Sequence, residues 1–193
     1  MQTKFKFLLL VLTSIIMSNT AMAETAEQIN QKADKVVEIF KQKPGATKFL
    51  SEVHGYLVFP SVIKGGFILG AEYGEGVLRV NNEPVEYYSI ASGSAGFQAG
   101  AQKASYLIAF ASQKALDNFR KSNGWEAGVD GTITVIDWGA AKDIASLSFE
   151  KPIYAFVFNA QGIMGGISIE GTKFTKMQPG KTEVYDDIQE YTK

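Results

Sequence analysis

The chain of 193 residues contains no cysteine and only one histidine, His54. Without cysteine it can form neither a disulfide nor a thiolate nucleophile, and it cannot carry a lipid on a cysteine. One histidine cannot supply a zinc site of the usual kinds, and no G-x-S-x-G motif marks a serine nucleophile. We therefore expect no catalytic residue, no metal and no cofactor. A hydrolase that uses carboxylates alone, drawn from Glu72, Glu86, Asp130 and Asp137, is the least favoured alternative.

The chain also lacks an excess of charge of one sign. Its 19 lysines and arginines stand against 20 aspartates and glutamates, which gives a net charge of −1. A protein whose main partner is nucleic acid usually carries a clear excess of positive charge. We therefore expect no nucleic-acid partner, and any attraction to an anionic surface has to come from a local group of lysines.

Long apolar segments are absent except near the N-terminus. Two lysines precede an apolar segment over residues 7–17, and the small-x-small sequence Ala-Met-Ala follows it at residues 21–23. This layout predicts a secretory signal peptide over residues 1–23, cleaved after Ala23. The alternative is an uncleaved membrane anchor, but the apolar segment is short for a bilayer span. Cleavage removes two lysines and no acid, so the net charge changes from −1 to −3. The expected location is the periplasm, with the protein either free or peripheral on a membrane.

The remaining residues, 24–193, predict one domain with a core over about residues 26–177. Apolar residues at helical spacing indicate helices over residues 25–42, 46–54, about 112–122 and 183–191. Alternating apolar residues between turn signals indicate strands over residues 56–59, 66–73, 76–80, 85–90, 94–101, 106–111, 132–137, 153–159, 163–169 and 173–177. Asn81-Asn82 predicts a tight hairpin turn. The fold class that follows is α+β: a mainly antiparallel, strongly curved sheet, with the N-terminal helices and the helix around 112–122 packed on it.

Glycine recurs through the otherwise apolar segment over residues 55–78. It occupies residues 65, 66, 70, 74 and 76. The G-x-x-x-G spacing of three of these is also found where membrane helices pack closely. However, Glu72 and Glu75 lie within the segment, and charges at the centre of a bilayer are costly. We therefore interpret the glycines as places where strands and turns approach closely.

A second glycine motif, "GISIEGTK" over residues 166–173, nearly matches a phosphate-binding loop. In that loop the lysine precedes a serine or threonine and a helix follows. Here the threonine precedes Lys173, and the flanking residues indicate strands. A β-turn at Glu170-Gly171 is the favoured interpretation.

Several lysines border glycine or strand segments and are candidates for binding an anion. Lys64 precedes Gly65 and Gly66, whose N–H groups could join its ammonium around a phosphate if this segment is an exposed corner. Further lysines of this kind are Lys103, Lys142, Lys151, Lys173 and Lys176. Each of them can equally be a solvated surface lysine, and the sequence alone leaves both interpretations open.

Five segments together resemble the SYLF lipid-binding domain family. They are "GYLVFPSVIKGGFILGAEYGEGVL", "YYSIASGSAGFQAGAQ", "YLIAFASQKALDNF", "GWEAGVDGTITVIDWGAA" and "IYAFVFNAQGIMGGISIEGTKFTKM". They follow one another in order from Gly55 to Met177, and the resemblance extends from about Ala26. It implies lipid binding without catalysis. The family includes eukaryotic phosphoinositide-binding proteins linked to actin patches and many small exported bacterial proteins.

The resemblance implies an anionic phospholipid or membrane surface as the partner. The expected headgroup-binding residues are Lys64, Gly65, Gly66, Lys173 and Lys176. In the eukaryotic relatives an amphipathic helix before the domain engages membranes, but the corresponding helix over residues 26–40 carries mixed charges, which favours packing on the sheet. Actin binding is not carried over, because an exported bacterial protein would not meet actin. The alternative is an envelope structural protein or one that binds an envelope protein partner.

Overall fold

The computed structural model describes residues 23–66, 69–95, 100–147, 149–161 and 169–180. The predicted signal peptide lies outside these residues, apart from Ala23, as do the helix expected over 183–191 and nearly all of the strand expected over 163–169. Thr25–Pro179 form one compact unit, which contains every helix and strand named below.

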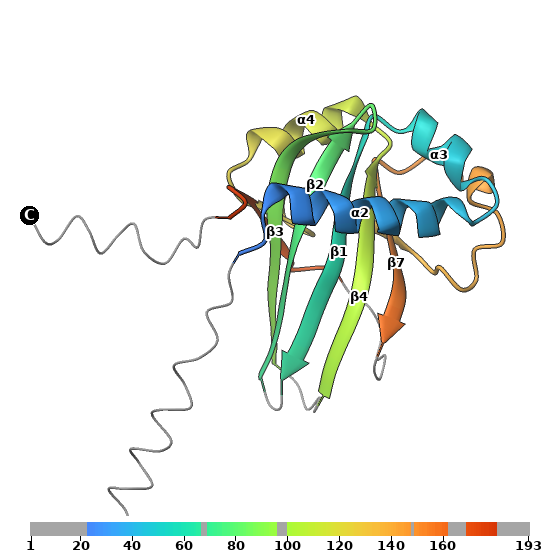
Figure 1. The fold of residues 1–193 in the computed structure, drawn as a ribbon. Helices are drawn as coiled ribbons and strands as arrows, with labels where there is room; N and C mark the ends of the chain where they lie inside the picture. The colour runs from blue at the N-terminus through green and yellow to red at the C-terminus, as the bar shows by residue number, and fades with distance from the viewer. Residues whose placement is uncertain (1–22, 67–68, 96–99, 148, 162–168, 181–193) are drawn as a thin grey trace, which may run out of the picture. The chain divides into compact units, whose positions relative to one another are not determined.

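Eight strands of the described residues form one sheet, in the order β5-β8-β3-β2-β1-β4-β7-β6. The strands are β1 (Gly55–Gly66), β2 (Leu69–Val80), β3 (Glu83–Ala95), β4 (Gly100–Phe110), β5 (Trp125–Glu126), β6 (Thr134–Ile136), β7 (Ile153–Gln161) and β8 (Lys173–Met177). Neighbouring strands are antiparallel, except that β6 and β7 are parallel. The sheet is strongly curved (Figure 1). A mainly antiparallel, curved sheet combined with helices confirms the predicted α+β class.

The helices are α2 (Ala26–Lys41), α3 (Ala46–Glu52) and α4 (Gln113–Lys121), with a 3-10 turn η1 (Ile144–Ser146). Figure 1 shows α2 lying across the strands on one side of the sheet. The two faces of the sheet bury separate apolar clusters. One cluster packs α2 and α3 against residues such as Val58, Val77 and Phe156. The other packs α4 against residues such as Leu57 and Ile108.

The central strands are longer than the sequence pattern predicts. The two strands expected over 66–73 and 76–80 are one strand, β2, and β1 continues to Gly66 instead of ending at Phe59. The strand expected over 94–101 is wrong, because those residues span the end of β3 and the start of β4. In these segments the strands are held by hydrogen bonds to the strands on both sides, and not by the burial of one face. The sequence therefore shows no alternation of apolar residues there.

The predicted turns are confirmed. Asn81 and Asn82 have φ of 53° and 66°, as a two-residue hairpin turn between β2 and β3 requires. Gly171 has φ of 74°, and the N–H of Thr172 donates to the carbonyl of Ile169 across Glu170-Gly171. The segment is therefore a turn followed by a strand, as expected, and not a phosphate loop followed by a helix. Among the described residues, no helix has the length and apolar character that a bilayer crossing needs.

Candidate functional site

Helix α2 is fixed by its sequence at both its start and its buried side. Thr25 and Gln28 form a capping box that satisfies backbone groups of the first turn. The residues that recur at helical spacing are buried against the sheet: Ile29, Ala33, Val36, Val37 and Phe40. The apolar side of the helix therefore packs on the sheet, as its mixed charges favour, while Lys32 and Lys35 stay exposed.

Polar contacts hold α2 over the sheet at a second point. The Nη2 of Arg79 on β2 lies 2.6 Å from Oδ1 of Asp34, and the Arg79 side chain is 9% exposed. Asn30 Nδ2 donates to the hydroxyl of Tyr87 on β3 at 2.9 Å. The helix is thus tied to two strands as well as packed on them.

An irregularity in β1 lies next to α2. The registers of β1 with β2 and with β4 both shift near Pro60 and Ser61. Proline has no N–H to donate to a ladder, so a bulge is the place in a central strand that tolerates it. The hydroxyl of Ser105 on β4 donates to the Pro60 carbonyl at 2.9 Å, which stabilises the bulge from the neighbouring strand.

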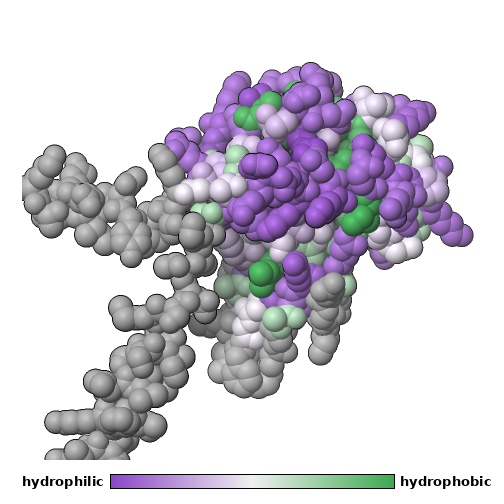
Figure 2. Space-filling model, viewed as in Figure 1, coloured by the Kyte–Doolittle hydropathy of each residue, from purple (hydrophilic) through white to green (hydrophobic). Residues whose placement is uncertain are grey.

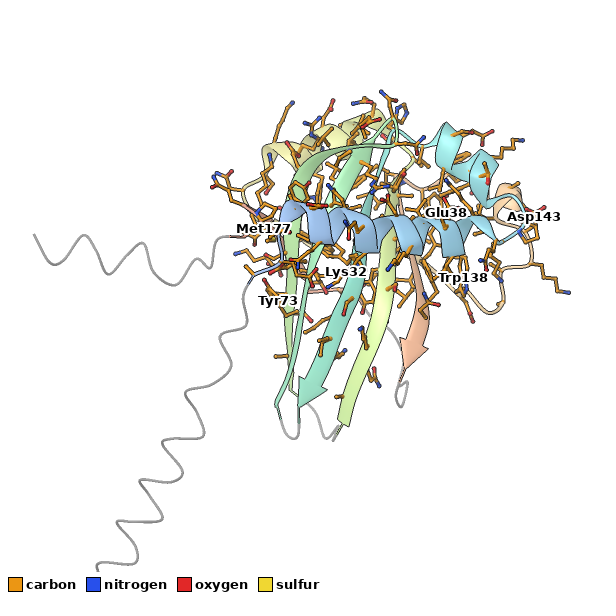
Figure 3. The ribbon with its side chains drawn as sticks, in the orientation of Figure 1. Lys32, Glu38, Tyr73, Trp138, Asp143 and Met177 are labelled. Atoms are coloured by element: carbon orange, nitrogen blue, oxygen red, sulfur yellow. The ribbon has the colours of Figure 1, made fainter. Side chains whose placement is uncertain are left out.

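A groove of about 560 Å³ lies where this bulge faces α2. It is lined from α2 by Lys32, Lys35 and Val36, from β1 by Pro60 and Ser61, from β4 by Lys103, Ala104 and Ser105, and from β7 by Asn159 and Ala160. The volume is in the range of small-ligand sites. Figure 3 shows Lys32 of α2 on the same side of the sheet as Tyr73.

The groove is positively charged. Three lysines from two elements line it, and none of the described residues that line it is acidic. Lys35 and Lys103 have no ion-pair partner among the residues that the structure describes, so two cations are available to a ligand. Asn159, with a left-handed φ of 53°, and the hydroxyl of Ser61 add polar groups. A phosphate or carboxylate group fits this combination of charge and hydrogen-bonding groups.

Of the predicted site residues, Lys64, Gly65 and Gly66 do not form an exposed corner. They are the last residues of β1 and pair with both β2 and β4. Lys64 lines a cavity of only about 20 Å³, together with Gln102 and Tyr106. That volume holds one water molecule and is too small for a phosphate group.

Lys173 and Lys176 lie on opposite faces of β8, since residues an odd number apart point to opposite sides of a strand. Lys173 is exposed on the α2 side. Lys176 lies on the α4 side, where its Nζ is 3.2 Å from Oε1 of Glu86. The five predicted residues are therefore not brought together, and their role in headgroup binding stays a prediction.

Glu86, which holds Lys176, is the centre of a polar cluster. It also accepts hydrogen bonds from Nε and Nη2 of Arg120 on α4 and from the hydroxyl of Tyr88. Partial burial acts to raise the pKa of Glu86, but the hydrogen bonds from Arg120, Tyr88 and Lys176 outweigh it and lower the pKa. Burial raises the pKa of Tyr88, and the bond to Glu86 raises it further. The cluster is structural, because each of its charges already has a partner.

The other candidate carboxylates also have structural partners. Asp130 accepts from the N–H of Glu126, and Asp137 accepts from the N–H groups two and three residues further on. Glu72 is buried and accepts from the hydroxyl of Ser92 at 3.0 Å. Over the part of the chain that the structure describes, no three His, Cys, Asp or Glu side chains are placed to hold a metal ion.

Sequence reasoning missed the groove as a site. It treated Lys103 as one of several candidate lysines, and Lys32 and Lys35 as the polar side of a helix. The available signal was the position of Lys32 and Lys35 beside the buried Val36, together with Pro60 inside an apolar strand. No spacing in the sequence shows that this helix crosses the bulge.

Comparison with known proteins places this fold in a family. Residues 91–191, just over half of the chain, match the family described as "Ysc84: Las17-binding protein actin regulator". A search of curated proteins finds no match. The matched residues include β4, α4, β7 and β8, and this family is the SYLF family that the quoted segments resemble. The chain therefore belongs to the Ysc84 family of SYLF domains.

Proposed function

We propose that this chain is exported to the periplasm and binds anionic phospholipid headgroups at a membrane surface, without catalysis. The observation that carries the proposal is the groove between α2 and the bulge of β1. There, Lys35 and Lys103 face a common space without ion-pair partners among the described residues, and Lys32 lines the same space. A phosphodiester placed between them gains charge-assisted hydrogen bonds that two separated surface lysines do not provide.

Because the chain has no excess of positive charge, we expect one local group of lysines to bind the anionic surface. Residues 24–193 have a net charge of −3, so attraction to an anionic bilayer arises from the groove and not from the whole surface. Each lysine near an anionic surface contributes about 1 kcal/mol. Three lysines therefore support moderate binding that weakens as salt screens them.

The proposal is tested by co-sedimentation of residues 24–193 with vesicles. Vesicles of neutral phosphatidylcholine alone are compared with vesicles that also contain anionic phosphatidylglycerol, first at low salt and then at high salt. We expect binding to the anionic vesicles at low salt and its loss at high salt. Equal binding to both compositions, or binding that salt leaves unchanged, would count against headgroup recognition and favour a protein partner in the envelope.

A further inference from the structure

Below α2, the sheet presents a face that no described helix covers (Figure 1). Its first row crosses five neighbouring strands: Lys103 (β4), Ile63 (β1), Tyr73 (β2), Ala91 (β3) and Lys173 (β8). Cross-strand partners share a face of a sheet, so these five side chains lie on one side. Val77 packs under α2 and lies on the same strand as Tyr73, four residues away, so this is the α2 side.

A second row beside the first carries only glycine and alanine. It consists of Ala101 (β4), Gly65 (β1), Ala71 (β2) and Gly93 (β3). We call the nine residues of the two rows the helix-free face. Two large side chains rise from it, those of Ile63 and Tyr73, which are 56% and 53% exposed and directly opposite each other. Figure 2 shows pale and hydrophobic atoms below the hydrophilic surface of α2.

Exposed lysines flank the apolar pair of this face. The apolar pair lies at the centre of the first row, and the exposed lysines Lys103 and Lys173 flank it on either side. Four strand spacings of about 4.8 Å separate the two lysines by roughly 19 Å. Two acids lie on the same side: Glu126 on β5 is the cross-strand partner of Lys173, and Glu75 on β2 accepts a hydrogen bond from the Tyr73 hydroxyl at 2.9 Å. Lys103 also lines the groove, so the two surfaces are continuous.

We propose that the helix-free face is the surface that rests on an anionic bilayer, with Ile63 and Tyr73 entering the interface between headgroups and acyl chains. The inference rests on the proposed function and adds to it the orientation and the anchoring residues. A tyrosine ring suits this depth because its apolar body and polar hydroxyl face different media. Lysines around an apolar centre extend their ammonium groups to the phosphates while their stems stay apolar.

The glycine and alanine row explains how two anchors suffice. Because glycine and alanine have no side chain or only a methyl group, the bilayer surface can approach the backbone of this row. The side chains of Ile63 and Tyr73 then extend deepest into the interface. Two side chains alone bury little apolar area, so we expect them to act only together with the lysines. This orientation also directs the lysines of the groove toward the same headgroups.

The first test of this orientation labels single introduced cysteines, which is possible because the chain itself contains no cysteine. Single variants Ile63→Cys and Tyr73→Cys are labelled with a polarity-sensitive fluorophore, as is the control Val129→Cys, whose side chain is 74% exposed in the segment after β5. On phosphatidylglycerol-containing vesicles we expect emission from positions 63 and 73 to shift to shorter wavelength and to be quenched by lipids with a quencher on the acyl chain. Position 129 should show neither change.

A second measurement does not depend on labelling. The double variant Ile63→Ala, Tyr73→Ala should lower the vesicle partition coefficient about tenfold, since it removes most of the apolar surface that enters the interface. Val129→Ala should leave the coefficient unchanged. Circular dichroism and thermal unfolding confirm that each variant is folded, which is expected because both replaced side chains are exposed.

The outcomes separate the two proposals. Vesicle binding without a change at positions 63 and 73 overturns the inference and leaves the proposed function standing. No binding to anionic vesicles at all overturns both. If the wild-type chain dimerises in solution, the double variant does not, and vesicle binding is unaffected, the helix-free face belongs to a second copy of the chain and the inference is wrong.

Discussion

At the scale of single residues, the glycines of β2 and β3 occur for different physical reasons. A Cβ added to Gly76 would overlap the carbonyl of Val58 and the ring of Phe59, and one added to Gly74 would lie 2.8 Å from the Ser61 carbonyl. These two positions lie opposite the bulge of β1, where the backbones approach most closely. Gly93 on β3, by contrast, has nothing within 4 Å of an added Cβ. Close approach therefore explains Gly74 and Gly76, and a flat surface accounts for Gly93.

The first prediction follows from this difference. Gly76→Ala should lower the free energy of unfolding by about 1–3 kcal/mol, because the added methyl forces β1 and β2 apart in the core. The control Gly93→Ala should change it by less than about 0.5 kcal/mol. Urea unfolding followed by circular dichroism measures both. Equal stability of the two variants would show that the bulge relaxes around a methyl group.

At the scale of elements, the cluster around Glu86 joins three parts of the fold. Glu86 lies on β3, Arg120 on α4 and Lys176 on β8. Nε of Arg120 lies 3.1 Å from Oε2 of Glu86, and Nζ of Lys176 lies 3.2 Å from Oε1. The hydrogen bonds to Glu86 hold its pKa below the ordinary value of 4.5, against the effect of its partial burial. A carboxylate with a lowered pKa stabilises the folded state above its unfolded pKa, and this contribution is lost as the pH falls through the folded pKa.

Glu86→Gln should therefore be less stable than the wild type near neutral pH. The difference in unfolding free energy should persist down to about pH 4.5 and shrink below it, because protonation then removes the same charge from the wild type. Urea unfolding at a series of pH values from about 7 to about 3 measures it. A difference that stays constant over this range would contradict a lowered pKa for Glu86.

The elements also show how far sequence reasoning extends. Helix α2, the Asn81-Asn82 turn and β8 were predictable, because capping, helical spacing and turn residues are local signals. The full lengths of β1 and β2 were not, since their outer halves lack apolar alternation and depend on strands far along the chain. The two-residue β5 carries too little pattern to predict.

At the scale of the whole compact unit, function depends on which lysines share a surface, and that is set by topology. The sequence grouped Lys64, Lys173 and Lys176 because each lies near glycine or in a strand, but β-strand alternation places Lys173 on one face and the other two on the other. The sheet instead brings Lys103 to Lys32 and Lys35, which lie about 70 residues earlier in the chain. The order of strands β1, β4 and β7 under α2 creates this juxtaposition.

The central claim is that the groove, and not surface charge in general, binds anionic headgroups. The most direct measurement compares the affinity for phosphatidylglycerol-containing vesicles of the double variant Lys35→Gln, Lys103→Gln with that of Lys114→Gln, Lys121→Gln. Both variants lose two positive charges, but the second pair lies on α4, which packs on the opposite face of the sheet. At about 1 kcal/mol for each lysine, the groove variant should bind roughly 30-fold more weakly than the wild type, and the α4 variant within about threefold of it. Equal losses in the two variants, or no loss in the groove variant, would contradict the account.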